Sequence, residues 1–167
     1  MLSRSSEYAI RALTHLARLN DGRHHLSRDL AEELGLPAPF LGKVLQPLVT
    51  RGVLHSQRGR SGGFRLARPA SSVTLIEIVD AQETLGPAET CLLGQRECSD
   101  ATACPMHEYW KKASNAFHDR LRRTTLADLV QHAATHPECA YPLPSGRVPA
   151  PTSVPTATHG TNVRSAI

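Results

Sequence analysis

The chain has 167 residues, of which 40% are hydrophobic and 4% aromatic, and this length suits one compact domain or a small domain with an appendage. No apolar run approaches the ~18 residues that cross a bilayer, and no signal-peptide pattern follows the N-terminus, so we expect a cytoplasmic protein without membrane contact. Residues 1–70 carry 11 Lys and Arg against 5 Asp and Glu, whereas residues 71–167 carry 8 against 10. The first part therefore has the charge of a phosphate-backbone binder, although a solvated basic face has the same composition.

Three short helices are predicted within the first 52 residues. Apolar residues recur at helical spacing over residues 6–20, and Ser27 as N-cap with Gly35 as the stop signal defines a second helix of about two turns. A third apolar stripe covers residues 40–52, where Pro47 predicts a kink or an early end. Two helices joined by a short turn form a helix-turn-helix, whose later helix enters the DNA major groove.

A β-hairpin is predicted after the third helix. Residues 53–57 and 64–68 alternate in polarity on either side of a Gly-rich tip, Arg58-Gly-Arg-Ser-Gly-Gly63, which is typical of two short antiparallel strands. After a helix-turn-helix, such a hairpin is a wing that lies over the DNA backbone or in the minor groove. A nucleotide-binding loop fits poorly, because G-x-G-x-x-G is absent and a strand follows instead of a helix.

The remaining helical patterns flank a cysteine-rich loop. A capping box at residues 74–77 opens a short helix, a longer amphipathic pattern runs over residues 106–121, and a last short helix begins at residue 125. The apolar stripe of the long helix is thin and includes Trp110 and Phe117, which favours pairing with a second subunit over burial in a monomer.

These patterns divide the chain into three parts. We expect a winged helix-turn-helix DNA-binding domain at residues 1–72, a cysteine loop with dimerisation helices at residues 73–136, and a disordered Pro-rich tail at residues 137–167. The fold class is therefore mainly α with a small β-hairpin wing and a long dimerisation helix. Cys139 lies in the tail and is interpreted as a bystander. No Walker loop or nucleophile elbow is present, so we do not expect an enzyme.

Three cysteines and one histidine lie close together in the loop. Cys91, Cys98, Cys104 and His107 follow the spacing C-x6-C-x5-C-x2-H. Cysteines this dense in a chain without secretory features are more typical of a metal or redox site than of a disulfide framework. Three thiolates and an imidazole suit an iron-sulfur cluster or a tetrahedral zinc ion. Two simpler interpretations stay open, a capping or surface histidine and thiols that oxidise.

Taken together and in this order, the motifs resemble the bacterial winged-helix regulators of the IscR and NsrR type, the Rrf-two family, over residues 1 to about 134. The stretches that carry the resemblance are residues 8–13 (YAIRAL), 30–32 with 41–48, the wing at 58–67, 74–78 (TLIEI), the cysteine loop, and 125–129 (TLADL). The resemblance implies a homodimer that binds a double-stranded, pseudo-palindromic DNA operator, with one winged helix per half-site and the paired long helices as dimer core.

In cluster-binding members of the family, the three loop cysteines hold an iron-sulfur cluster that senses redox, nitric oxide or iron-sulfur status and alters DNA affinity. The corresponding residues are Cys91, Cys98 and Cys104. His107 falls where IscR-like members supply a histidine to a 2Fe-2S cluster, and we favour this interpretation. Glu7 falls where NsrR-like members bring a carboxylate from the partner subunit to a 4Fe-4S cluster, which stays open. Other members bind no cluster, so a regulator that uses zinc, thiol oxidation, a small ligand or a partner protein is the alternative.

Two positions depart from the family pattern. Six residues separate Cys91 from Cys98, one more than in IscR-like members, and a loop can absorb this insertion. Gly42 stands where IscR carries a glutamate that discriminates between operators, so no operator preference is transferred.

Five side chains are candidates for DNA contact. Lys43 and Gln46 lie about one turn apart on the third helix and can face base edges or phosphates. Arg58 and Arg60 of the wing are the strongest candidates, because arginine suits a narrow minor groove. Arg28 is expected at a phosphate. A solvated surface charge is the simpler interpretation of Lys43 and Arg28.

Overall fold

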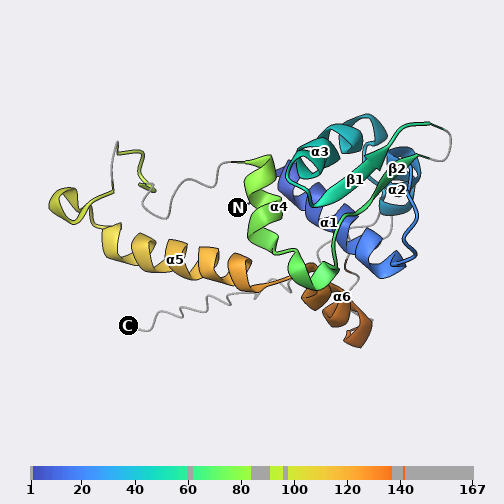
Figure 1. Ribbon diagram of the computed structural model, residues 1–167. Helices are drawn as coiled ribbons and strands as arrows, with labels where there is room; N and C mark the ends of the chain where they lie inside the picture. The colour runs from blue at the N-terminus through green and yellow to red at the C-terminus, as the bar shows by residue number, and fades with distance from the viewer. Residues whose placement is uncertain (1, 60–61, 84–90, 96–97, 137–140, 142–167) are drawn as a thin grey trace, which may run out of the picture.

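The computed structural model describes residues 2–59, 62–83, 91–95, 98–136 and 141. Over these residues the chain forms helices and one antiparallel hairpin, in the order α1 (Arg4–Leu19), α2 (Ser27–Leu34), α3 (Ala38–Thr50), β1 (Leu54–Gln57), β2 (Gly63–Leu66), α4 (Leu75–Gln82), α5 (His107–Arg123) and α6 (Leu126–Thr135). Figure 1 shows α1, α2, α3 and the hairpin gathered in one lobe, with α5 extending away from it. The predicted fold class, mainly helical with a small hairpin wing, is confirmed.

Helix α1 is the central helix of the lobe. The Ser3 hydroxyl accepts a hydrogen bond from the Ser6 N–H at 3.1 Å and caps the N-terminus, while Asn20 ends the helix in the left-handed region at φ 41°. Its apolar stripe includes Leu13, which is fully buried, and packs against α3, α4 and α6. This single amphipathic helix therefore joins the helix-turn-helix to the elements that follow the wing.

The structure corrects the predicted N-cap of the second helix and rules out one of the two outcomes predicted at Pro47, an early end of the third helix. Helix α2 begins at Ser27 itself, with Leu26 as N-cap and without a side-chain cap, and the Ser27 hydroxyl lies against α3, 3.6 Å from where a Cβ atom on Gly42 would stand. Helix α3 does not end early but continues through Pro47 to Thr50. The lost backbone bond is tolerable there because Pro47 is only half-buried and shares a face with exposed Lys43, which lets water reach the unpaired carbonyl.

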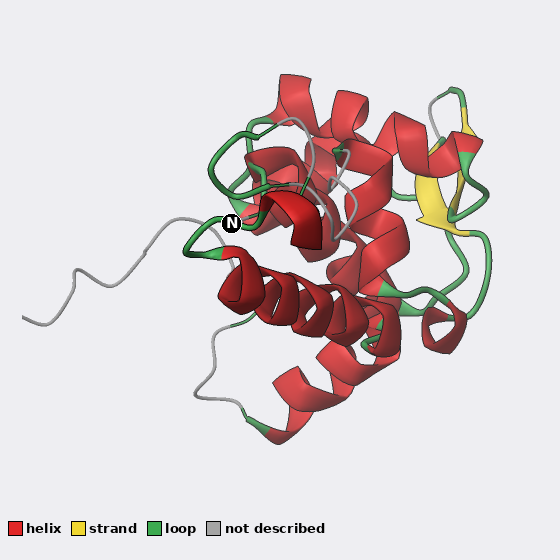
Figure 2. Cartoon of the chain, turned by 90° about the vertical axis from the view of Figure 1, so that its left-hand side faces the viewer, coloured by secondary structure: helices red, strands yellow, loops and turns green. Residues whose placement is uncertain are grey.

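The hairpin is attached to the α1–α2 connection. Strands β1 and β2 pair in antiparallel register, with His55 opposite Arg65, and two backbone hydrogen bonds of 2.9 and 2.8 Å join His25 reciprocally to Phe64. Gly63 has φ 124°, and a Cβ atom there would lie 2.1 Å from the His25 carbonyl oxygen. A glycine is therefore required where the wing meets the lobe. Figure 2 shows the two strands at the edge of the helical body.

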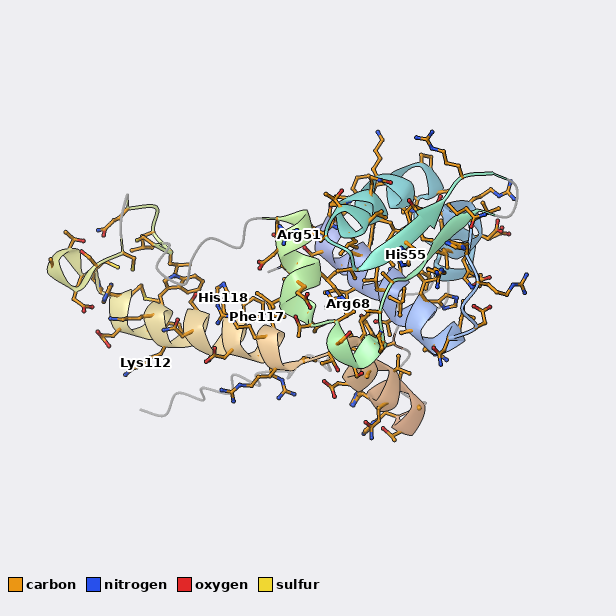
Figure 3. The ribbon with its side chains drawn as sticks, viewed as in Figure 1. Arg51, His55, Arg68, Lys112, Phe117 and His118 are labelled. Carbon is orange, nitrogen blue, oxygen red and sulfur yellow. The ribbon has the colours of Figure 1, made fainter. Side chains whose placement is uncertain are left out.

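Helix α4 connects the lobe to α5. The predicted capping box is present, with the Thr74 N–H donating to Glu77 Oε2 at 2.9 Å. Arg68 donates to the other Glu77 oxygen, and the Arg51 guanidinium donates to the Asp80 carbonyl at 2.7 Å (Figure 3). Two arginines that flank the wing thus hold α4 against the winged helix, and α4 also packs on α5.

The residue that follows α4 reaches back to the start of α1. The Glu83 carboxylate accepts hydrogen bonds from the Ser3 N–H and from the hydroxyl of fully buried Ser6. Burial alone would raise the pKa of Glu83, but the hydrogen bonds from Ser6 and Ser3 outweigh it and hold the pKa below its ordinary value. A negative charge at the N-terminus of α1 is also favoured by the helix dipole. The C-terminal end of α4 is therefore tied to the start of α1.

We expect the unfolding free energy to fall as the pH drops from about 5 to 3, and to fall less in Glu77→Gln. Burial raises the pKa of Glu77, but hydrogen bonds from Thr74 and Arg68 outweigh it and leave the pKa lowered. A carboxyl group whose pKa is lower in the folded protein than in the unfolded chain stabilises the fold at pH values above its unfolded-state pKa. This stabilisation is lost as the pH falls through the folded-state pKa. At pH 7 the variant should be less stable by about 0.5–1 kcal/mol, because Gln keeps the cap and loses the ion pair. Urea unfolding at several pH values measures both effects, and an unchanged acid dependence in the variant contradicts this account.

Helix α5 carries exposed aromatic side chains. Tyr109 and Phe117 are 68% and 44% exposed, and Trp110 is half-buried. Helix α5 packs against α4, and its buried residues include Leu121, one helical turn after Phe117. Over the described residues, no helix is both long and apolar enough to cross a membrane.

The predicted tail, including Cys139, lies outside the described residues apart from Tyr141. This side chain packs against the core and shares a hydrogen bond with the Thr14 hydroxyl, and burial raises the pKa of its phenol. One residue of the predicted tail therefore docks on α1. The proposed boundaries at residues 72 and 136 stay predictions.

Candidate metal centre and DNA-binding face

The side chains expected to meet DNA are exposed on the winged lobe. Lys43 and Gln46 lie on the outer face of α3, and Arg58 lies at the end of β1, all exposed. Arg28 on α2 has a side chain that is 78% exposed. Arg60 lies outside the described residues. The DNA contacts of these five side chains stay predictions.

The structure adds histidines to this basic surface that sequence reasoning missed. His55 is paired with Arg65 across the hairpin and is labelled in Figure 3. The pKa of His24 is lowered by burial and then by the positive charges of Arg65 and His55. His24 therefore lies beside the hairpin, although its position in a loop offered no sequence signal for this contact.

The first cysteine of the loop lies in a turn whose backbone surrounds its sulfur. The Gly94 N–H donates to the Cys91 carbonyl at 3.2 Å, and Gly94 adopts φ 77°. The Cys91 side chain is buried, and the backbone N–H groups of Gln95, Leu93 and Gly94 donate toward its sulfur and lower the pKa of the thiol. Such a ring of N–H groups favours the thiolate, the form that binds metal.

The second cysteine lies next to the first and to the histidine. Cys98 is half-buried, and a hydrogen bond links its side chain to that of Cys91. Burial raises the pKa of Cys98, and so do the neighbouring charges of Cys91 and Cys104. The Cys98 sulfur lies 3.3 Å from Nδ1 of His107. The fold thus places Cys98 between Cys91 and His107, with Cys104 near enough for its charge to act on Cys98, and all three cysteines are free thiols. Over the described residues, no three donor atoms of this set lie within 4.8 Å of one another.

The third cysteine and the histidine are joined by a local turn. The His107 N–H donates to the Cys104 carbonyl at 2.9 Å, and His107 is the first residue of α5. Pro105, the second residue of this turn, has the preset φ that the position favours. The C-x2-H spacing therefore joins Cys104 to the first residue of α5 through a local backbone turn, whereas the contact of the imidazole with Cys98 depends on the path of the loop.

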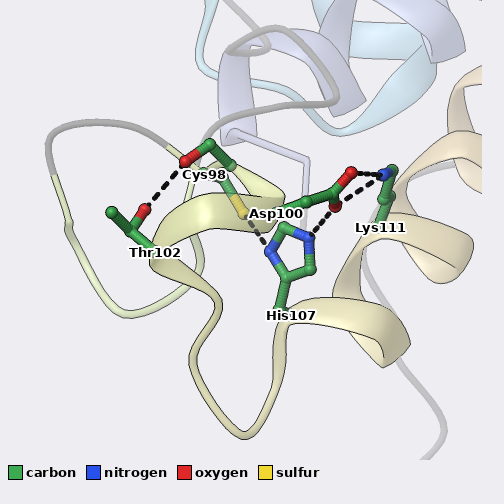
Figure 4. Close-up of polar contacts among 6 residues, drawn as sticks. Cys98, Asp100, Thr102, His107 and Lys111 are labelled. Atoms are coloured by element: carbon green, nitrogen blue, oxygen red, sulfur yellow. Dashed lines mark hydrogen bonds and ion pairs between the residues drawn. The ribbon is translucent and has the colours of Figure 1, made fainter.

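The histidine ring is held between the Cys98 sulfur and the Asp100 carboxylate (Figure 4). His107 is 4% exposed, and its Nε2 lies 2.8 Å from Asp100 Oδ1, which also receives a hydrogen bond of 3.0 Å from Lys111. Hydrogen bonds from His107 and Lys111 lower the pKa of Asp100, and Asp100 raises the pKa of Lys111. Sequence reasoning missed Asp100 and Lys111, because only the folding of the loop onto α5 brings them to the histidine.

The donor set fits a soft or borderline metal centre. Three thiols and one imidazole are the ligands typical of iron-sulfur clusters and zinc, and the hydrogen-bonded Cys91 sulfur is already favoured as thiolate. Glu7, the alternative fourth ligand, has a side chain that is 57% exposed and lies 3.8 Å from Arg11 on its own helix. A role for Glu7 would need a second subunit, whereas His107 is already beside a cysteine sulfur.

The model of the Rrf2 family, described as iron-dependent transcriptional regulators, matches residues 2–132. The chain belongs to the Rrf2 family. The predicted resemblance is confirmed, and transcription regulation through DNA binding, which is not an enzymatic activity, is the function of this family.

Relatives of this Rrf2 chain show the same affiliation. Protein aau3 of Rhizobium meliloti is 37% identical over 133 residues, which cover 78% of this chain and 84% of aau3. A protein of Aquifex aeolicus assigned by name to the HTH-type transcriptional regulators is 33% identical over 138 residues, with coverage of 81% and 95%.

Two solved structures show the same Rrf2 fold. IscR of T. potens superposes with a TM-score of 0.64 at 24% identity, covering 80% of this chain and 88% of IscR. CymR, named as the global cysteine regulator of B. subtilis, superposes with a TM-score of 0.66 at 23% identity, covering 79% of this chain and 97% of CymR. These similarities establish the winged-helix arrangement of the chain.

Proposed function

We propose that this protein is a homodimeric, operator-binding transcriptional regulator whose DNA affinity is controlled by an iron-sulfur cluster on Cys91, Cys98, Cys104 and His107. The cluster would make the protein a sensor of redox conditions, nitric oxide or iron-sulfur status. The observation that carries the proposal is the 3.3 Å contact between the Cys98 sulfur and His107 Nδ1, with Cys91 hydrogen-bonded to Cys98 on its other side. A histidine in direct contact with one of the cysteine sulfurs favours a 2Fe-2S cluster over the 4Fe-4S cluster that Glu7 would complete.

The chain offers a physical route from this centre to the DNA-binding face. The three cysteines precede α5, α5 packs on α4, and α4 packs on α1 and α3. Arg51, at the end of the DNA-reading helix, donates to the α4 backbone at Asp80, and Glu83 binds the start of α1. A change in the loop that shifts α4 would therefore move the winged lobe.

A homodimer is supported by α5. Its exposed Tyr109 and Phe117 would be unusual on a monomer surface and match a helix that pairs with a second copy. A pseudo-two-fold operator then receives one wing from each subunit. Size-exclusion chromatography with light scattering tests the dimer, and a monomeric mass at micromolar concentration contradicts it.

The decisive experiment is an anaerobic absorption spectrum and native mass spectrum of freshly purified protein. A coloured species that contains iron and sulfide supports the proposal, and its mass increment distinguishes 2Fe-2S from 4Fe-4S. Operator binding measured with the loaded protein and the apoprotein then tests control by the cluster. Colourless protein without iron and sulfide after anaerobic reconstitution contradicts it.

A cluster-free regulator is the second candidate. Cys91 and Cys98 are free thiols that lie close enough to share a hydrogen bond. Two thiols this close also suit thiol oxidation or a Cys3His zinc site. The fold similarity to CymR, whose name records cysteine regulation, supports a cysteine-responsive or ligand-responsive version of this candidate. Stoichiometric zinc without sulfide, or a disulfide that alone changes operator affinity, would favour it.

Arg58→Ala is expected to weaken operator binding and to lower the slope of log K against log salt by about 1, because one phosphate or minor-groove contact is lost. Arg58 is exposed at the end of β1, so its removal should leave stability unchanged. Lys112→Ala is the matched control, an exposed cation on α5 far from the wing (Figure 3). Fluorescence anisotropy over a salt series measures both variants. Equal slopes for Arg58→Ala and the wild type would remove Arg58 from the interface.

A further inference from the structure

We propose that Asp100 is the positioning residue of the histidine ligand, fixing the ring of His107 so that Nδ1 faces the Cys98 sulfur with its lone pair free. This inference rests on the proposed cluster site. It adds a residue that none of the sequence motifs contains, and it assigns a binding atom to the histidine.

The binding atom of His107 follows from the different contacts that its two ring nitrogens make. Nδ1 lies 3.3 Å from the Cys98 sulfur, and Nε2 lies 2.8 Å from Asp100 Oδ1. A carboxylate can only accept a hydrogen bond, so the proton of the neutral ring lies on Nε2. Nδ1 is then unprotonated on the thiol side, which is the form an imidazole needs to bind a metal. A histidine ligand that donates its other N–H to a carboxylate is the usual arrangement of metal sites.

The carboxylate is itself held in place. Lys111 Nζ donates to both Asp100 oxygens, at 3.0 and 3.4 Å. Lys111 follows His107 by one helical turn on α5, so two residues of the same helix face bind one carboxylate of the loop. The ring is also 4% exposed, so its rotation is restricted by packing as well as by the hydrogen bond. Asp100 therefore joins the cysteine loop to α5 through the ring.

Two other roles of Asp100 make different predictions. In the first, Asp100 and Lys111 form a surface ion pair without influence on the ring, since the Asp100 side chain is 74% exposed. In the second, Asp100 is itself a metal ligand, because donor atoms of Asp100, His107 and Glu108 lie within 4.8 Å of one another. Two measurements distinguish these roles from a positioning role. One is the tautomer of the His107 ring in the apoprotein, and the other is the identity of the atoms that bind the cluster in the loaded protein.

The first measurement uses the metal-free full chain and a two-bond ¹H–¹⁵N correlation spectrum of the His107 ring. In the wild type we expect the Nε2–H tautomer. In Asp100→Ala this preference should be lost, and in Asp100→Asn, which keeps an acceptor oxygen, it should be largely restored. Asp119→Ala removes a similarly exposed carboxylate, 58% exposed and paired with Arg122 on α5, and should change nothing. A wild-type ring protonated on Nδ1, or an Asp100→Ala ring that matches the wild type, overturns the inference without bearing on the cluster.

The second measurement uses the iron-loaded protein. Pulsed electron paramagnetic resonance of the reduced cluster should show one histidine nitrogen in the wild type. Chelator-driven iron loss should be about 10-fold or more faster in Asp100→Ala than in Asp119→Ala, the size typical for loss of an outer carboxylate. A cluster without nitrogen coupling, or equal rates in both variants, overturns the inference while the cluster stands. Wild-type protein that takes up no iron and sulfide instead overturns the proposed function, and the apoprotein spectrum still decides the role of Asp100.

Discussion

Cys98→Ser is expected to abolish the visible absorption of anaerobically reconstituted protein and the difference in operator affinity between reconstituted protein and apoprotein. Cys98 is the sulfur that touches the other donors, through the hydrogen bond with Cys91 and the 3.3 Å contact with His107. Serine is nearly the same size as cysteine, but its hydroxyl oxygen does not replace a soft thiolate as a metal ligand. The side chain is half-buried in a loop outside the hydrophobic core, so the fold should persist. Iron and sulfide analysis, with operator binding on the same samples, measures the effect.

Cys139→Ser is the matched control for this variant. Cys139 is the fourth cysteine of the chain and lies outside the C-x6-C-x5-C-x2-H pattern. It should retain wild-type iron, sulfide and operator response. The proposed ligand set would be wrong if Cys98→Ser kept its full cluster content, or if Cys139→Ser lost it to the same degree.

Gly63→Ala is expected to lower the unfolding free energy by about 3 kcal/mol and to reduce operator affinity strongly. The left-handed φ of 124° costs an alanine roughly 1–2 kcal/mol. The added Cβ would also lie 2.1 Å from the His25 carbonyl oxygen. Relief of that overlap separates the wing from the lobe and breaks the two His25–Phe64 backbone hydrogen bonds, each worth about 1 kcal/mol. Denaturant unfolding and anisotropy with operator DNA measure both losses.

Gly59→Ala separates backbone strain from steric overlap. Gly59 also has a positive φ, 104°, but an added Cβ would meet no atom within 4 Å. Its expected cost is therefore roughly 1–2 kcal/mol, from the backbone alone. Equal losses of stability in the two variants would show that the close approach of the wing to His25 contributes nothing.

Hydrophobic spacing and short motifs predicted the helices, the wing and the cysteine-histidine set. Residues that recur every three to four positions share one helix face, and a capping box or a C-x2-H turn is complete within a few residues. For this reason the contact between Cys104 and His107 followed from a local turn. The family resemblance added the order of the elements, which the family match confirmed over residues 2–132.

Contacts between segments distant in the sequence determined the features that the sequence pattern did not predict. Helix α3 continues past Pro47 because that residue lies on a partly exposed face, which depends on the neighbours of the helix and not on its own sequence. Asp100 reaches His107 only because the loop folds onto α5, and Arg51 reaches α4 only because the lobe is assembled. A one-dimensional pattern records which residues share a face or a turn, whereas contacts between separate segments depend on the path of the whole chain.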